Sequence, residues 1–393
     1  MPAHSASEVG RRIAYYRRIS RLTQKQLAEA AGLGAGTLQK IERGARGASD
    51  AVLEAIADAL GVNVERLHRD RDRAAGRIQE AMPHLRGLLA AYDDPDDGPV
   101  RELCVLRDAV AEAVQQRLAA QYVRIMRSGP DLLAELLRAL AVVPARDRAE
   151  VAQLLVGASR AVDAAAYKYG AMDMSARLVD LMRWVAPQTH DPVTASTVAY
   201  VRTEVYFASR AHAAGLRSLE RAIDASPSPG DARAAAARGA LHMRAAVIAG
   251  RAGDSDAATQ HMDQAFKLAA RVPESVYDGT AFGPDSVRIH EVSLSVALGG
   301  VHLKRALDIG REWAPSRELT AERRSSFYIE LARAQLWAGR PDSAFRSLEE
   351  ARQIAPQHTR EHRWVREDIG TLRRLRRTNA ESLSKYAEWC AAV

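Results

Sequence analysis

Two short patterns in the 393-residue sequence combine residue types that do chemistry in other proteins. Residues 30–44, AAGLGAGTLQKIERG, contain Gly32-x-Gly34-x-Gly36, a spacing that could form a loop around a phosphate. Residues 358–362 read His-Thr-Arg-Glu-His, which matches the H-x-x-E-H pattern of a zinc peptidase. Each pattern needs particular elements around it, so the flanking sequence decides whether it is functional.

The glycines lack the β-strand that a phosphate-binding loop requires. Such a loop follows a strand and opens a helix whose N-terminus points at the anion. Here residues 23–26, TQKQ, form a capping-box pattern that predicts the start of a helix. Gly32 then falls just after that helix, where a left-handed residue is favoured. The glycines therefore predict a turn between two helices, and the dinucleotide-binding interpretation fails.

The zinc pattern lacks a third ligand. Two histidines at i and i+4 can face one metal ion, but a catalytic zinc site needs a third protein ligand, and only 31 residues follow His362. The two cysteines, Cys104 and Cys390, cannot form a four-thiolate site. The sequence carries no nucleophile motif either. We therefore expect no metal, no cofactor and no enzymatic activity.

The composition predicts an all-α protein of two or three domains. Hydrophobic residues make up 47% of the chain and aromatic residues only 5%, while alanine and leucine abound, as in helices packed closely on helices. The first residues, MPAHSASEVGRR, lack the apolar core of a signal peptide. No window approaches the ~20 apolar residues of a membrane span. We expect a cytoplasmic protein with no membrane partner.

The net charge of +7 is concentrated at the N-terminus. Residues 1–47 hold nine basic and three acidic side chains, so the other 346 residues carry a net charge of only +1. A small basic module on a nearly neutral body is typical of a protein that binds a polyanion. Within this module, residues 35–43 are expected to form a helix with Leu38 and Ile41 on its inner face.

These N-terminal features resemble the DNA-binding domain of the XRE, or lambda-repressor-like, regulators. The passages that carry the resemblance, within residues 8–68, are LTQKQLAEAAGL, TLQKIERG and LEAIADALGV. The resemblance implies that the helix at 35–43 enters the major groove of double-stranded DNA. It implies the following DNA-contacting residues: Gln24, Ala35, Gly36, Thr37, Gln39, Lys40, Arg43 and Arg46.

Each of these residues has an expected role. Gln24 would meet a phosphate, and Arg43 and Arg46 would hold the DNA backbone beyond the recognition helix. The family usually has polar side chains where this chain has Gly34, Ala35 and Gly36. Base readout would then rest on Thr37, Gln39 and Lys40, with apolar contact from Ala35, and specificity would be modest or depend on DNA shape. The alternative is a helix-turn-helix reused to bind a protein.

The rest of the chain is expected to be helical throughout, with weak internal repeats. Helices are predicted near 74–91, 100–127, 130–140, 145–169 and 173–186, separated by glycine and proline signals such as SGP at 128–130. Three later segments share the spacing small-x3-apolar-x2-Ala, starting at Gly215, Ala258 and Ala344, with a degenerate copy near Ala306. Small residues at these positions let paired helices approach, which predicts a solenoid of helix pairs.

The body also resembles regulators of the actinobacterial type, which join an XRE head to a tetratricopeptide-repeat body. Residues 167–184, 203–222, 282–299 and 330–356 carry this resemblance. The fold expected is therefore a lambda-repressor-like helix-turn-helix bundle followed by an α-solenoid. We expect a helix-turn-helix domain at 1–72, a helical dimerisation region at 73–190, and repeats with capping helices at 191–393.

Charged and aromatic residues gather on the predicted first helices of the repeats, which would line the concave side of a solenoid. The candidates for a ligand groove are Arg202, Glu204, Tyr206, His242, Arg244, Arg288, His290, Glu291, Tyr328 and Arg333. The same residues could instead be core aromatics and surface ion pairs. Related peptide-sensing regulators hold a peptide with asparagines, and this body has none before Asn379, which favours a small molecule, a protein partner or no ligand.

Together these features predict a dimeric, sequence-specific transcriptional regulator whose body dimerises and senses a small molecule or a peptide. The alternative is a repeat scaffold that recruits a protein partner, with DNA binding secondary. Binding of a partner by the body, together with no DNA sequence preference, would favour the scaffold.

Overall fold

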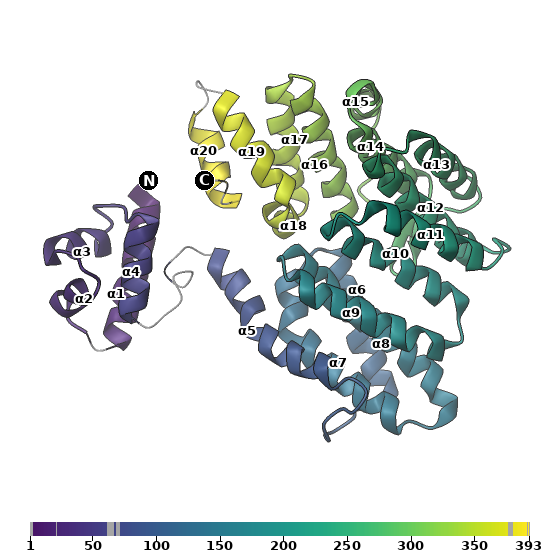
Figure 1. The fold of residues 1–393 in the computed structure, drawn as a ribbon, viewed down its shortest axis with the longest axis horizontal. Coiled ribbons are helices and arrows are strands. Elements are labelled where there is room, and N and C mark those ends of the chain that lie inside the picture. The colour runs from purple at the N-terminus through teal and green to yellow at the C-terminus, as the bar shows by residue number, and fades with distance from the viewer. Residues whose placement is uncertain are drawn as a thin grey trace. The chain divides into compact units, whose positions relative to one another are not determined.

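The computed structural model describes residues 3–20, 22–60, 67, 71–375, 380–390 and 392. It divides into two compact units, Met1–Pro83 and His84–Val393, which we call the head and the body (Figure 1). The described residues are helical apart from loops and one two-stranded hairpin, so the all-α prediction is confirmed. Within them, no helix combines the length and apolar character needed to cross a membrane.

The head is a bundle whose core is aliphatic. Its helices are α1 (Ala3–Ile19), α2 (Gln24–Ala30), α3 (Ala35–Glu42) and α4 (Asp50–Leu60). The predicted capping box is present, because Gln26 N donates to Thr23 Oγ1 at 3.2 Å and Thr23 N donates to Gln26 Oε1 at 2.9 Å. Gly32 is left-handed, with φ of 65°, as predicted for the turn between α2 and α3.

The body is built mainly of antiparallel helix pairs that follow one another around a curve (Figure 1). Helix α5 (Arg71–Ala90) crosses the boundary between the two units. The helices after it are α6 (Leu103–Leu118), α7 (Tyr122–Val142), α8 (Ala145–Lys168), α9 (Met172–Val185), α10 (Pro192–Ala208), α11 (His212–Ala225), α12 (Ala232–Ala252), α13 (Ser255–Ala269), α14 (Pro284–Leu298), α15 (Leu303–Glu312), α16 (Ala321–Trp337), α17 (Pro341–Ile354), α18 (Pro356–Glu361), α19 (Arg363–Leu375) and α20 (Ala380–Cys390).

The repeated small residues lie where paired helices touch, which confirms their predicted role. A Cβ at Gly215 of α11 would lie 2.3 Å from Ile248, and one at Gly310 of α15 would lie 2.4 Å from Leu331. Ala258 of α13 and Ala344 of α17 are fully buried. The pairs can therefore approach only because these side chains are absent or small.

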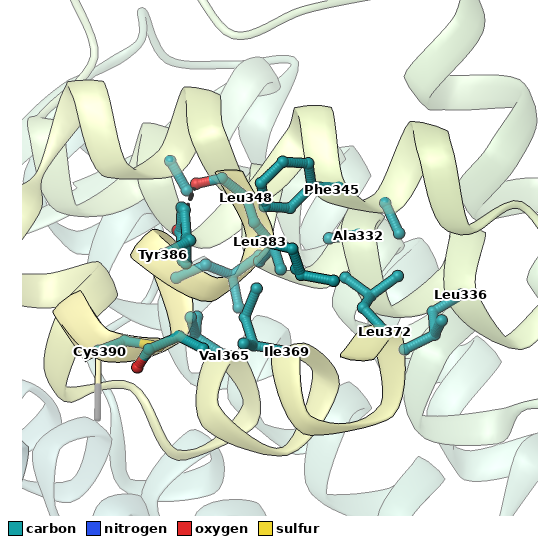
Figure 2. Close-up of a cluster of buried hydrophobic side chains, with 14 residues drawn as sticks. Ala332, Leu336, Phe345, Leu348, Val365, Ile369, Leu372, Leu383, Tyr386 and Cys390 are labelled. Carbon is teal, nitrogen blue, oxygen red and sulfur yellow. Dashed lines mark hydrogen bonds between the residues drawn. The ribbon is translucent and has the colours of Figure 1, made fainter. Parts of the chain in front are cut away.

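The last repeats end in an apolar cluster between α16, α17, α19 and α20. Figure 2 shows Phe345, Leu372 and Tyr386 among the side chains that meet there. Tyr386 is buried, and its hydroxyl donates to the carbonyl of Leu348 at 2.6 Å. The final helices thus cover an apolar face that a repeat array would otherwise expose.

One predicted helix boundary is wrong. Helices were expected over 100–127 and 130–140, but the break falls at residues 119–121, where Ala120 has a φ of 55°. Helix α7 continues through Pro130, because its apolar stripe packs on α8. Gly129 lies so close to α8 that a Cβ there would be 2.6 Å from Val162. This packing outweighs the missing N–H of the proline.

A β-hairpin that was not predicted from the sequence lies between α13 and α14. Strand β1 (Ser275–Tyr277) pairs antiparallel with β2 (Thr280–Phe282). Asp278 and Gly279 form the turn with φ of 46° and 73°, the type I′ geometry that Asp-Gly favours. Phe282 is buried against Gly239 of α12, where a Cβ would be 2.0 Å from its ring. Phe282 thereby anchors strand β2 against α12.

Candidate functional sites

Helix α3 of the head presents a polar outer face. Leu38 and Ile41 are buried in the aliphatic core, and this orientation turns Gly36 and Lys40 outward, where both are exposed. Thr37 and Gln39 are half-buried at the edges of the same face, and Ala35, Arg43 and Arg46 are exposed. No described atom outside its own helix turn lies within 4 Å of a Cβ placed at Gly36. The start of α3 is thus an open surface on which another molecule can lie closely.

Glu42, at the end of α3, fixes the helix against α1 and α2. Arg17 of α1 donates to both of its oxygens, at 2.7 and 3.1 Å, and to the carbonyl of Leu22. The hydrogen bond with Glu42 raises the pKa of Arg17. Gln24 of α2 donates its amide N–H to the second Glu42 oxygen at 2.6 Å. Charge-assisted bonds of this kind set the position of α3 against α1 and α2.

This arrangement refines two sequence predictions. Arg17 contributes to the basic composition of the head, but its charge is balanced within the fold by Glu42. Gln24 remains a predicted phosphate contact, yet its amide nitrogen already has a partner in Glu42, so that contact would have to share the group. The exposed basic side chains that remain for a polyanion include Arg18, Lys25, Lys40, Arg43 and Arg46.

The centre of the body holds a second candidate site, which we call the interior cluster. It consists of Arg117, Arg160, Tyr200, Glu204, Arg244, His290 and Arg323, from helices α6, α8, α10, α12, α14 and α16. Tyr200 is its centre. Its hydroxyl accepts a hydrogen bond from Arg323 Nη2 at 2.8 Å, and the guanidinium of Arg244 lies 4.5 Å from its ring centroid. The guanidinium of Arg160 lies 5.7 Å from the same centroid.

The other contacts of the cluster use mostly neutral groups. His290 donates from Nδ1 to the Ser286 carbonyl, which leaves Nε2 to accept from Arg323 at 3.2 Å. Arg160 donates to the Asp278 carbonyl and to the Thr280 hydroxyl at the hairpin tip, and Arg117 donates to the Gly279 carbonyl. Arg244 pairs with Glu204 at 3.4 Å.

Burial and the neighbouring arginines shift the pKa values of three groups in the interior cluster. Burial and repulsion from Arg117 lower the pKa of Arg160 to about 9. Burial disfavours the Tyr200 phenolate, but Arg244, Arg323 and Arg160 together lower the pKa of Tyr200 to about 8. Burial, Arg323 and Arg244 hold the pKa of His290 well below its ordinary value, so its ring stays neutral.

The structure brings only some of the predicted groove residues together. Glu204, Arg244 and His290 belong to the interior cluster. The remaining seven lie elsewhere in the body, and their contacts are local to other helices: Arg202, Tyr206, His242, Arg288, Glu291, Tyr328 and Arg333.

Two of these seven border separate pockets. Arg202 stacks on Tyr206 and lines a cavity of about 550 Å³ between α9, α10 and α11. His242 contacts His261 at 3.0 Å and lines a second cavity, of about 530 Å³, beside Arg238 and Arg271. The residues predicted to line one groove therefore lie at several separate places in the body.

The rest serve packing and ion pairs. Arg288 stacks on Trp313, Glu291 pairs with Arg305 at 2.7 Å, and Tyr328 packs on Phe327. Arg333 donates to Asp368 at 3.2 Å and to Glu367, and it stacks on Trp364. These contacts match the alternative of core aromatics and ion pairs that the sequence left open.

His358, the first residue of the 358–362 pattern, contacts polar side chains inside the body. His358 is buried, and its ring contacts the Ser325 hydroxyl at 2.6 Å and Lys168 Nζ at 3.0 Å. The ammonium of Lys168 can only donate, so Nε2 of His358 accepts and its Nδ1 carries the proton. Burial and Lys168 hold the pKa of His358 well below its ordinary value. Both ring nitrogens are thus used by protein groups.

Three central residues of the cluster were not predicted from the sequence. Arg117, Arg160 and Arg323 lie on helices that showed no repeat signal or at positions outside the compared spacing. The Asp278-Gly279 dipeptide between two short β-prone runs could have revealed the hairpin, but nothing local indicates that its tip reaches Arg117, more than 150 positions away.

Comparison with known proteins supports the assignment of the head. Residues 13–67 match the helix-turn-helix family HTH_3. The head is a helix-turn-helix domain. The protein is accordingly a DNA-binding transcriptional regulator. A search among curated proteins found no match to the chain.

Two solved structures of regulators are remotely similar to the chain. PlcR of Bacillus thuringiensis, in complex with the peptide PapR7 and DNA, is 15% identical, with 67% of this chain and 95% of that chain covered and a TM-score of 0.29. A point mutant of PrgX is 10% identical, with 97% of this chain and 99% of that chain covered and a TM-score of 0.27. Likenesses this remote carry no argument about the ligand or the partner of this chain.

Proposed function

We propose that this regulator reads a specific DNA sequence as a dimer and that its body senses a small molecule or a peptide. The observation that carries the DNA part is the outer face of α3. Lys40 and Gly36 are exposed there because Leu38 and Ile41 are buried on the opposite face. An α-helix held this way fits the major groove, where base edges differ for all four base pairs.

Base readout is proposed to rest on Thr37, Gln39 and Lys40, and positioning on Gln24, Arg43 and Arg46. Lysine can donate to the acceptors of guanine, and glutamine can pair with adenine. Ala35 and Gly36 allow close approach and contribute no hydrogen-bonding side chain, so part of the specificity would come from DNA shape.

Dimerisation is proposed because one head offers few contacts. Two heads spaced about 34 Å apart can bind two half-sites on one side of the duplex. We assign dimerisation to the body, as expected for residues 73–190. Light scattering of the full chain should report a dimer, and a monomer at micromolar concentration would contradict this part of the proposal.

The sensing role is supported by the connections within the interior cluster. Its side chains come from helices between α6 and α16, and they meet through hydrogen bonds such as that between Tyr200 and Arg323. A ligand that changes these contacts would change how the helix pairs stack, and a differential affinity of ~1–3 kcal/mol between two arrangements is enough for regulation.

The decisive experiment is selection of DNA. The full chain is incubated with random duplex fragments, and the retained fragments are sequenced. We expect one enriched motif with two-fold symmetry. Lys40→Ala should weaken binding to that motif by ~1–3 kcal/mol and relax one base preference. Lys25→Ala is the matched control, because Lys25 is also an exposed lysine, lies on α2 and is outside the predicted contacts. Absence of any enriched motif would overturn the proposal of sequence-specific binding.

A further inference from the structure

The interior cluster contains more positive charge than its own carboxylates balance. Arg117 and Arg160 are 7% and 8% exposed. Among the residues that the structure describes, no carboxylate oxygen lies within 4 Å of the guanidinium of Arg117, Arg160 or Arg323. Buried charges of one sign are costly unless they are paired. Glu204 is the one carboxylate of the cluster and pairs with Arg244, so the four arginines of the cluster are not fully balanced.

The nearby acidic groups are already engaged. Glu204 pairs with Arg244, and Glu322 pairs with Lys168 at 3.5 Å. Asp163 accepts a hydrogen bond from Ser175, and burial and Glu204 raise its pKa well above the ordinary value. Asp278 and Asp191 both pair with Arg233.

Two donors in the cluster also lack a partner. The Nε atoms of Arg117 and Arg244 are buried and make no hydrogen bond in the structure. A buried N–H on a charged group normally has an acceptor, and its absence costs more than the average hydrogen bond contributes. These N–H groups add an independent reason to look for a missing acceptor.

The cluster can be reached from solvent. The side chains of Arg244 and Glu204 keep 20% and 22% of their exposure, and Arg323 is half-buried. Arg244 and Arg323 approach the same phenol, one over the ring and one at the hydroxyl. An acidic group between them could accept from both, because planar guanidinium groups bind carboxylates and phosphates through paired N–H donors.

From these observations we infer that the interior cluster binds a small organic anion, whose carboxylate or phosphate group lies between Arg244 and Arg323 beside Tyr200. This assignment rests on the proposed sensing function and specifies the chemical class of its ligand. The anion would supply the negative charge that the cluster lacks and would connect α12 with α16.

The first test measures binding directly, without DNA. Thermal unfolding of the full chain is followed by tryptophan fluorescence during titration with citrate or with pyrophosphate, and sodium chloride keeps the ionic strength constant. We expect a saturable rise in melting temperature with at least one anion. The comparison of the two anions distinguishes a carboxylate site from a phosphate site.

Variants tie the effect to the cluster. Replacing Arg244→Gln and Arg323→Gln together should weaken anion binding at least about tenfold, since two charge-assisted bonds are lost. Arg311→Gln is the matched control, because Arg311 is 72% exposed and pairs locally with Asp308 on α15. No saturable rise with either anion, or equal binding by the double variant and the wild type, would overturn the inference.

A second measurement does not require an arginine variant to fold. Phenolate absorbance near 295 nm is titrated between pH 7 and 10, and the Tyr200→Phe profile is subtracted. The positive neighbours that lower the pKa of Tyr200 to about 8 would be neutralised by a bound anion, so saturating citrate or pyrophosphate should shift that titration to higher pH. An unchanged titration in the presence of both anions would also overturn the inference.

Measuring anion binding and DNA binding together distinguishes failure of the anion site from failure of the proposed function. If the anion binds but leaves the affinity for the selected DNA motif unchanged, the anion site stands and the sensing role fails. If neither anion binds while the motif is still recognised, the anion site fails and the DNA-binding part of the proposed function stands.

Discussion

The head and the body place their charged residues in opposite ways. The head has an aliphatic core, and most of its basic side chains lie outside it, with the bonds between Glu42, Arg17 and Gln24 as its main polar link. The body surrounds arginines, histidines and carboxyl groups with its helix pairs. A surface charge attracts a partner at little cost to folding, whereas a buried charge must be balanced inside the molecule. The head is therefore suited to meet a polyanion, whereas the charges of the body are balanced mainly within the fold.

The largest expected difference between the two regions is the loss of stability at acid pH. Burial lowers the pKa of His242 to about 4, lowers that of His261, and holds those of His290, His358 and His362 well below the ordinary value. Unfolding exposes these rings, which then bind protons below pH 6.5. Stability is therefore lost as the pH falls below about 6.5.

Three carboxyl groups oppose this effect. Burial raises the pKa of Glu330 to about 7, that of Asp368 to about 6, and that of Asp163 well above its ordinary value. Near pH 5.5 Glu330 and Asp368 therefore hold protons in the folded state that the unfolded chain releases. The five histidines outnumber these carboxyl groups, so on balance unfolding takes up protons near pH 5.5 and stability falls as the pH falls.

Tryptophan fluorescence isolates the body, because all five tryptophans lie in it. Urea unfolding should show the steepest loss of stability between about pH 6.5 and 5. His358→Gln should reduce the slope by about one proton. A free energy of unfolding that does not change over this range would contradict the prediction that these histidines are neutral in the folded body.

The second prediction sharpens the comparison within the head, where two glycines of α1 and α3 differ in their surroundings. A Cβ at Gly10 would lie 2.1 Å from the Ile41 carbonyl oxygen and 2.6 Å from that of Glu42, both backbone atoms, so α1 would have to move away from α3. Gly10→Ala should destabilise the head by about 3 kcal/mol. Gly36→Ala meets no atom within 4 Å and should stabilise α3 by about 0.5–1 kcal/mol.

Amide hydrogen exchange of residues 22–60 and binding to the selected DNA motif report on the head in the full chain. Gly10→Ala should lose protection and DNA binding, while the tryptophan transition of the body stays at the wild-type position. Parallel loss of the body transition would show that the two units do not unfold independently.

The contrast between the two regions also explains what could be predicted from the sequence. The helix starts and turns of the head follow from neighbouring residues: Thr23 with Gln26, and Gly32 at its left-handed position. The repeats of the body could be predicted for the same reason, since one spacing of small and apolar residues recurs in the segments that start at Gly215 and Ala344. Local signals failed where distant packing decided the outcome, as at Pro130, which stays inside α7 because Gly129 packs on Val162.

The candidate sites divide along the same line. The outer face of α3 follows from helical periodicity once Leu38 and Ile41 are assigned to the core. The interior cluster joins Tyr200 to Arg323 and Arg117 to Gly279, contacts between residues more than 100 positions apart. No spacing rule relates such residues. Sequence alone could mark Arg244 and His290 as unusual but could not tell them from Arg202 and Arg288.

The smallest predicted effect tests whether the hairpin tip belongs to the interior cluster. Gly279 and Gly253 both have positive φ, of 73° and 83°, so an alanine at either position costs about 1 kcal/mol in backbone strain. They differ in surroundings. A Cβ at Gly253 meets nothing within 4 Å, whereas one at Gly279 would lie 2.9 Å from Arg117 Nη2 and 3.2 Å from Arg160 Nη1.

These are the ends of flexible side chains and can move, so the two variants should lose similar stability in urea unfolding. Only Gly279→Ala should disturb Arg117 and Arg160, which bond the carbonyls of the hairpin tip. Because Arg160 helps to lower the pKa of Tyr200, displacing its guanidinium should shift the phenol titration to higher pH in Gly279→Ala and leave it unchanged in Gly253→Ala. Identical titrations would mean that the hairpin supports the body only by its packing, since a tip coupled to the cluster cannot move the arginines without changing the potential at Tyr200.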